Sequence, residues 1–229
     1  MRKGSKPGIQ AVILYGSYGR GDAVSDSDVD VCVFTANTGG TTEDTIRALV
    51  PSLPNKPLNL VFYPPEAIKA MLDYGSLFLW HIKLEGKALF GHEYVEAILK
   101  GLKPFDQHLK EILFLMGLLL DLKEAMNSSW MPNELDLSIL FTIARNTCIV
   151  LCHKQGKIVF GRYMCYKTAC HLFPDLPLTE HTFSYLSKWK TIYERSPDPG
   201  ARLPDRYEMR GLILEIERFL NYAYEQTKR

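Results

Sequence analysis

The chain has 229 residues, of which 46% are hydrophobic and 23% charged, and its formal net charge is +1 at pH 7. This composition excludes a disordered or fibrous chain and fits a globular protein of two domains. The near-neutral balance argues against an extended nucleic-acid-binding surface. The longest apolar run, Ile112–Leu120, is too short to cross a bilayer, and no apolar signal core follows the basic N-terminus. We therefore expect a cytoplasmic protein with no membrane partner.

The first hundred residues alternate between short apolar runs and helix-start patterns. Two buried strands are predicted, over residues 9–15 and 29–35, and a third strand over residues 58–63. Helices are predicted over residues 42–53, 64–73 and 76–84, followed by a possible short strand at 87–91. Strand patterns largely stop after this point.

The rest of the chain reads as helical, because apolar residues recur at spacings of three and four. Helices are predicted over residues 104–126, 135–154, 167–173, 182–193 and 206–226. We therefore predict an α+β protein with a first domain over residues 1–100 and an all-helical domain over residues 101–229. The five cysteines lie in apolar segments without a Cys-x-x-Cys pair, which favours reduced core thiols over a zinc site.

Residues 16–30, between the first two predicted strands, read GSYGRGDAVSDSDVD. The three glycines at 16, 19 and 21 allow the backbone to turn tightly and bring its N–H groups close to an anion, while the Ser17 hydroxyl adds a donor. Such a turn can hold a triphosphate. The plain alternative is an ordinary glycine-rich loop.

Two aspartates stand one residue apart at the start of the second predicted strand, Asp28 and Asp30. Side chains two residues apart on a strand project to the same face, so the two carboxylates can share a cation. Magnesium prefers oxygen ligands and keeps waters and substrate phosphates. The pattern therefore predicts a metal site beside the phosphate turn, whereas the alternative is a solvated loop capped by Asp26 and Asp28.

The segment from Gly16-Ser17 to Asp28-x-Asp30 resembles the signature of the DNA polymerase β-like nucleotidyltransferase superfamily. The resemblance implies an N-terminal mixed-sheet domain with flanking helices, and transfer of a nucleoside monophosphate from a nucleoside triphosphate, for which we expect AMP from ATP. It also implies Mg²⁺ or Mn²⁺ held by Asp28 and Asp30. The residues expected to bind the nucleotide are Gly16, Ser17, Arg20, Ser27, Arg162 and Lys167.

The family usually carries a third acidic residue on a following strand, and the matching position here is Asn59. An amide can coordinate a cation through its oxygen, but it cannot accept a proton at neutral pH. Glu66 and Glu85 are the nearest acidic substitutes, although Glu66 suits the start of its helix better. The predicted catalytic set is therefore Asp28, Asp30 and Asn59.

The segment from Phe141 to Val159, followed by Phe-Gly-Arg162 and Lys167-Thr-Ala, is similar to the C-terminal domain of aminoglycoside nucleotidyltransferases. In those enzymes a basic residue after the helix reaches the nucleotide, which implies that role for Arg162 and makes Lys167 and Arg145 further candidates. A solvated or salt-bridged role is the alternative for each. Acidic residues are too scattered in this half to predict a cationic antibiotic as the acceptor.

Three functions compete. The leading one is an enzyme that transfers a nucleoside monophosphate to the hydroxyl of a small-molecule or macromolecular acceptor chosen by the helical half. The second is a catalytically weak or inactive nucleotide-binding module, similar to an antitoxin, and the third is a helical adaptor with a vestigial first domain. Because family members often carry a helix before the first strand, the surface left here could contact a second copy or another protein.

Overall fold

The structure, a computed structural model, describes residues 8–24, 27–36, 42–126, 130–195 and 200–228. The chain divides into two compact units, Met1–Asp106 and Gln107–Arg229. The first unit combines a sheet with helices, and the described part of the second unit is helical. The predicted α+β class with a helical C-terminal part is therefore confirmed.

The first unit is built on a four-stranded mixed sheet with the strand order β3-β2-β1-β4. The strands are β1 (Ile9–Tyr15), β2 (Val29–Thr35), β3 (Leu58–Tyr63) and β4 (Lys87–Phe90). The helices are α1 (Gly16–Arg20), α2 (Glu43–Leu49), α3 (Pro65–Tyr74), α4 (Leu77–Glu85) and α5 (His92–Leu99). β1 pairs antiparallel with β2 and β4, whereas β2 and β3 run parallel and are joined through α2.

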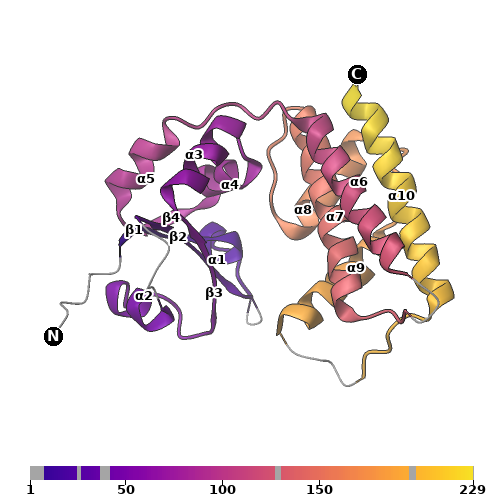
Figure 1. Cartoon of the computed structure of the whole chain (residues 1–229), viewed down its shortest axis with the longest axis horizontal. Coiled ribbons are helices and arrows are strands. Elements are labelled where there is room, and N and C mark those ends of the chain that lie inside the picture. Colours follow the sequence, from indigo (N-terminus) through magenta and orange to yellow (C-terminus); the bar gives the residue numbers. More distant parts are fainter. Residues whose placement is uncertain (1–7, 25–26, 37–41, 127–129, 196–199, 229) are drawn as a thin grey trace. The chain divides into compact units, whose positions relative to one another are not determined.

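The central strands β1 and β2 are largely buried, and alternation along them divides the core into two layers. Cys32 and Phe34 of β2 pack with apolar residues of α3, α4 and α5. Val31 and Val33 face the opposite side, where Ile46 of α2 packs. Figure 1 shows α3, α4 and α5 on one side of the sheet and α2 on the other. Asp30 precedes Cys32 by two residues, so it belongs to the face covered by α3, α4 and α5.

The second unit contains α6 (His108–Ala125), α7 (Glu134–Lys154), α8 (Arg162–Leu172), α9 (Glu180–Arg195) and α10 (Arg206–Lys228). α7 is its central helix, because it packs against α6, α8, α9 and α10. A capping box starts α7: Asn133 Oδ1 accepts from the Asp136 N–H, and Asp136 Oδ2 accepts from the Asn133 N–H. α7 is long and apolar enough to cross a bilayer, but 72% of its apolar window is buried, as expected for a core helix.

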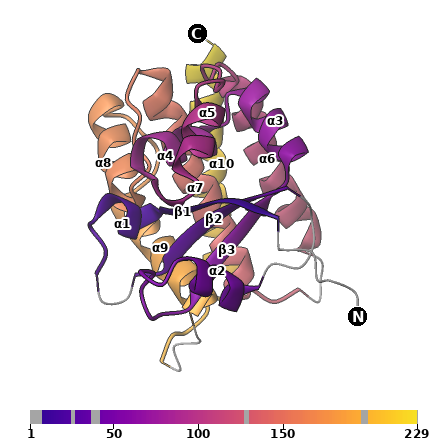
Figure 2. The ribbon, with the colours of Figure 1, turned by 90° about the vertical axis from the view of Figure 1, so that its left-hand side faces the viewer.

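Two helices lie outside the predicted elements, and a third begins earlier than predicted. The glycine-rich segment after β1 folds into one short helix, α1, which Gly21 closes with a φ of 83° (Figure 2). Because α5 has only eight residues, its apolar pattern is short, and prediction missed it. α8 begins at Arg162 rather than at Lys167, since Gly161 precedes a turn that already buries Cys165 and Tyr166.

Candidate functional site

A row of three residues crosses the sheet where the predicted phosphate turn leaves β1. Tyr15, the last residue of β1, pairs with Asp30 of β2, and Asp30 pairs with Asn59 of β3. Asn59 Nδ2 donates a hydrogen bond of 2.9 Å to Asp30 Oδ1. The register of the sheet therefore places the carboxylate predicted to bind metal directly beside the amide at the third predicted catalytic position.

The Asp30 carboxylate also lies close to the backbone of Gly16. A Cβ atom at Gly16 would lie only 2.4 Å from Asp30 Oδ2, and Gly16 has a φ of 66°, in the left-handed region. Any larger residue would be strained and would overlap the carboxylate. Glycine at position 16 is therefore required by the close approach of the turn to Asp30.

Arg20 fixes the end of α1 to the end of α4. Its guanidinium lies 2.9 Å from Glu85 Oε2 and 3.1 Å from Asp22 Oδ2, and its side chain is 23% exposed. His81, one turn before Glu85 on α4, places Nε2 3.0 Å from the same Glu85 oxygen. Gly19 permits this packing, because a Cβ there would lie 2.7 Å from the Glu85 carbonyl oxygen.

The Glu85 carboxyl is held by contacts with the Arg20 guanidinium and the His81 ring. Burial raises its pKa, but the hydrogen bonds from His81 and Arg20 outweigh that effect, and the pKa lies below the ordinary value. Burial lowers the pKa of Arg20, and the contacts with Asp22 and Glu85 raise it overall. The His81 ring also packs edge-on against Tyr15, with 5.6 Å between ring centroids, so this cluster adjoins the residue paired with Asp30.

The remaining predicted residues of the first unit hold the turn together. The Ser17 carbonyl accepts the N–H groups of Gly21 and Asp22, at 2.9 and 3.0 Å. Ser27 Oγ accepts the Val24 N–H at 2.8 Å. Asp28 is partly buried immediately before β2. Asp26, the predicted loop cap, lies outside the described residues.

Among the described residues, no group of three or more His, Cys, Asp or Glu side chains is arranged to hold a metal ion. The Asp28 and Asp30 carboxylates and the Asn59 amide oxygen would offer an all-oxygen donor set, which suits a hard cation that completes its shell with water and phosphate. Neither substitute acid completes this set, because Glu85 binds Arg20 and His81, and Glu66 is exposed in the first turn of α3. The donor set thus fits magnesium but stops one carboxylate short of the family pattern.

The predicted residues of the helical unit lie on α7 and α8. Arg162 donates a 2.7 Å hydrogen bond to Thr191 Oγ1 of α9, and its guanidinium lies 3.8 Å from the Glu194 carboxylate. Arg145 donates a 2.7 Å hydrogen bond to the Phe160 carbonyl oxygen. Lys167 is exposed on α8. Each arginine therefore has a structural role inside its own unit.

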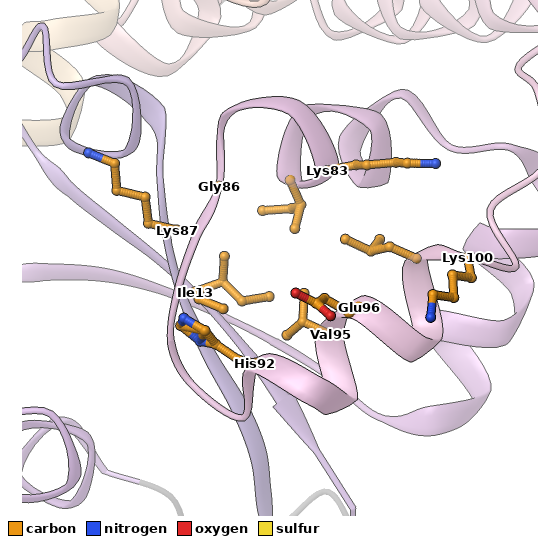
Figure 3. A pocket seen from close by; sticks show the side chains of 11 residues that line it. Ile13, Lys83, Gly86, Lys87, His92, Val95, Glu96 and Lys100 are labelled. Atoms are coloured by element: carbon orange, nitrogen blue, oxygen red, sulfur yellow. The ribbon is translucent and has the colours of Figure 1, made fainter.

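A pocket of about 560 Å³ opens between α4, β4 and α5 (Figure 3). Its lining includes the apolar side chains of Ile13, Ile82, Val95 and Leu99. In Figure 3 the Glu96 carboxylate points into the pocket, whereas the ammonium groups of Lys83 and Lys87 point away from it. The pocket shares no lining residue with the Tyr15–Asp30–Asn59 row.

Comparison with known families identifies the first unit. Residues 4–93 match the family described as Polymerase beta, Nucleotidyltransferase. The matched segment contains the whole sheet and every residue of the row centred on Asp30. The first unit is therefore a domain of the DNA polymerase β-like nucleotidyltransferase superfamily, which confirms the predicted resemblance. No curated protein matches the chain.

Sequence reasoning did not find the cluster of Arg20, Glu85 and His81. Glu85 was considered only as a substitute acid, and its contact with Arg20 joins positions 65 residues apart. One local sign was available, since His81 and Glu85 are separated by four residues on a predicted helix and therefore face the same way. Nothing in the sequence indicated that Tyr15 belongs to the site, because its position fits the apolar end of a strand.

Proposed function

We propose that this protein is a cytoplasmic, magnesium-dependent nucleotidyltransferase that transfers a nucleoside monophosphate to the hydroxyl of an acceptor selected by the helical unit. AMP from ATP is the proposed donor reaction. The acceptor oxygen forms a bond to the α-phosphorus, and the bond from that phosphorus to pyrophosphate breaks. The hydroxyl proton passes to water, because the Asn59 amide cannot accept it at neutral pH.

In this proposal the turn after β1 binds the triphosphate. Gly16 and Ser17 contribute backbone N–H groups and a hydroxyl, and Ser27 contributes a second hydroxyl. Arg20 contributes positive charge at the end of α1, where Glu85 and Asp22 restrict its position. Arg162 and Lys167 of the helical unit are the proposed further contacts to the nucleotide.

Asp28 and Asp30 would hold Mg²⁺, or Mn²⁺ in its place, with Asn59 beside them. When bound, the ion neutralises phosphate charge and assists departure of pyrophosphate. The chain's own contribution is to fix the Asp30 carboxylate, because one oxygen accepts from Asn59 and the other lies against Gly16. A carboxylate fixed on both sides loses little freedom when it binds a cation.

The observation that carries this proposal is the position of Asp30 at the junction of the turn and the strand row. One residue there contacts both the glycine where the phosphate turn begins and the third predicted catalytic position. A purely structural loop does not require a carboxylate at that junction. Together with the family match over residues 4–93, this arrangement supports nucleotide transfer.

The test is pyrophosphate release and label transfer with Mg²⁺ and each labelled nucleoside triphosphate, in the presence of cell extract as a source of acceptors. Asp28→Asn and Asp30→Asn keep the side-chain shape but remove the charge, and each should abolish both signals. Asp44→Asn, an exposed change in the first turn of α2, is the matched control and should retain activity. Equal activity in all three variants would refute the proposal.

A second function is favoured by one observation, the amide of Asn59 at the position of the expected third acid. In that reading the first unit binds a nucleoside triphosphate but transfers nothing, and the protein acts as an interaction module similar to an antitoxin. Calorimetry would then show Asp30-dependent nucleotide binding, while no pyrophosphate appears with any nucleotide or extract. Pyrophosphate release by the unmodified protein would exclude this second function.

A further inference from the structure

Helix α6 carries exposed apolar side chains on the side that faces away from its own unit. Leu113 is 50% exposed, Phe114 61% and Leu120 55%. The buried residues of α6 are Ile112, Leu115, Leu119 and Leu122, and they lie on the side packed against α7 and α10. Successive residues of an α-helix are rotated by about 100° around its axis. On this basis Gly117 lies on the side of α6 directly opposite the mean direction of these four buried residues. The exposed stripe is therefore centred on a glycine.

Packing within the unit does not explain this glycine. A Cβ at Gly117 would meet no atom within 4 Å, so alanine would fit without any rearrangement. Glycine inside a helix is less favourable than alanine because it loses more backbone freedom on folding. A glycine flanked by exposed leucines does, however, allow the backbone of another helix to approach closely. Gly117 thus suits a contact outside the unit.

The charges on this side of α6 are opposite at its two ends. Lys110 lies seven residues before Gly117, and Glu124 lies seven residues after it. Both side chains are exposed. Two antiparallel copies of α6 crossing at Gly117 would bring the lysine of each copy opposite the glutamate of the other. A parallel pair would instead oppose like charges.

We propose that α6 binds α6 of a second copy of this chain, in an antiparallel arrangement with a two-fold axis at Gly117. Leu113 of each copy packs opposite Leu120 of the other, and the two Lys110–Glu124 pairs close the ends of the contact. This is an isologous interface, in which the same surface serves both copies. A single pair of helices buries less area than a standard interface, so the dimer dissociates on dilution.

The first test is sedimentation velocity of the full chain over a concentration series. The unmodified protein should shift from monomer to dimer with concentration, and Leu113→Glu should raise the dissociation constant by roughly thirtyfold or more, since it buries charge at the contact. The matched control is Leu214→Glu on α10, because Leu214 has the same 50% exposure. Circular dichroism establishes that both variants fold.

A charge exchange provides the second test. Lys110→Glu alone should weaken the dimer, and Lys110→Glu combined with Glu124→Lys should restore it. Fourteen residues separate the two positions, which is about 21 Å along a helix, so they cannot pair within one copy. Restoration by the double variant therefore reports contact between two chains.

Three results would overturn the proposal. One is a chain that stays monomeric at every concentration, as expected if the stripe covers another part of the same molecule. Another is a dimer that Leu113→Glu leaves intact, since the interface then lies elsewhere. The third is a double charge variant no tighter than Lys110→Glu alone.

Discussion

The side chain of Asn59 donates from Nδ2 to Oδ1 of Asp30 across 2.9 Å, although the two residues lie 29 positions apart in the chain. The contact gives one oxygen of the Asp30 side chain a hydrogen-bond donor without adding charge, because an amide N–H is a neutral donor. A carboxylate at position 59 would instead repel Asp30 until a cation joined the two. The residue at position 59 therefore determines how strongly the strand row depends on metal.

Asn59→Asp should make the stability of the first unit depend on magnesium. Without Mg²⁺ the variant loses a hydrogen bond and gains a like-charge contact, so we expect it to be less stable by about 1–2 kcal/mol. Added Mg²⁺ should remove most of this difference and, under the proposed function, raise the rate of pyrophosphate release. Thermal unfolding with Mg²⁺ and with a chelator measures the first effect.

Asn59→Ala is the control for that change, since it removes the donor without adding charge. Its loss of stability should be the same with and without Mg²⁺. If Asn59→Asp also responded equally in both conditions, the inferred role of position 59 would be wrong.

Gly16→Ala should destabilise the first unit by about 3 kcal/mol, because a left-handed conformation and an overlap with Asp30 act together. Gly21→Ala isolates the first effect, as Gly21 has a φ of 83° but no atom within 4 Å of an added Cβ. That variant should lose only about 1 kcal/mol. Chemical denaturation measures both, and equal losses would contradict the close approach of Gly16 to Asp30.

Glu85→Gln should lower stability at neutral pH by about 1–2 kcal/mol, since the charge-assisted contacts with Arg20 and His81 are lost. Because the folded-state pKa of Glu85 lies below its ordinary value of 4.5, this stabilisation is complete above pH 4.5 and disappears as the pH falls through the folded-state pKa. Denaturation curves for the two proteins should therefore converge in acid. Glu66→Gln, an exposed change, should show little difference at any pH.

Arg162→Ala should destabilise the helical unit by about 1 kcal/mol, because it removes the hydrogen bond to Thr191 that joins α8 to α9. Lys167→Ala on the same helix is exposed and should change stability by less than about 0.5 kcal/mol. Unchanged stability in Arg162→Ala would contradict this structural role. Nucleotide titration of both variants, below their unfolding temperatures, tests whether either residue also contacts the nucleotide.

The fold could largely be predicted, because apolar residues recur along the main strands and helices in patterns that differ between the two kinds of element. The apolar runs of β1, β2 and β3 bracket the glycine turn and the two aspartates, and the amphipathic repeats of α6, α7 and α10 show the change to a helical unit. The place of Asn59 could also be anticipated, since parallel pairing of β2 with the next strand brings position 59 beside Asp30. These inferences need only the local pattern of apolar residues and the order of the elements along the chain.

Contacts between side chains on different elements could not be predicted in the same way. The contact of Arg20 with Glu85 depends on how α1 and α4 meet at the end of the sheet, which no local pattern specifies. The short helix α5 has two buried residues, Val95 and Leu99, too few to establish a period. The close approach of Gly16 to Asp30 could not be predicted from the sequence, because many glycines in turns have no side chain of another residue close to them.

The sheet order also limits when the strand row can form during folding. β1 and β2 are antiparallel neighbours in the chain, so the turn and Asp30 can meet through a short loop closure. β3 reaches its place beside β2 only after the crossover through α2 closes, and parallel pairing of this kind is slow. The row is therefore completed by the arrival of Asn59, so a nascent chain would present Asp30 to solvent before its amide partner arrives.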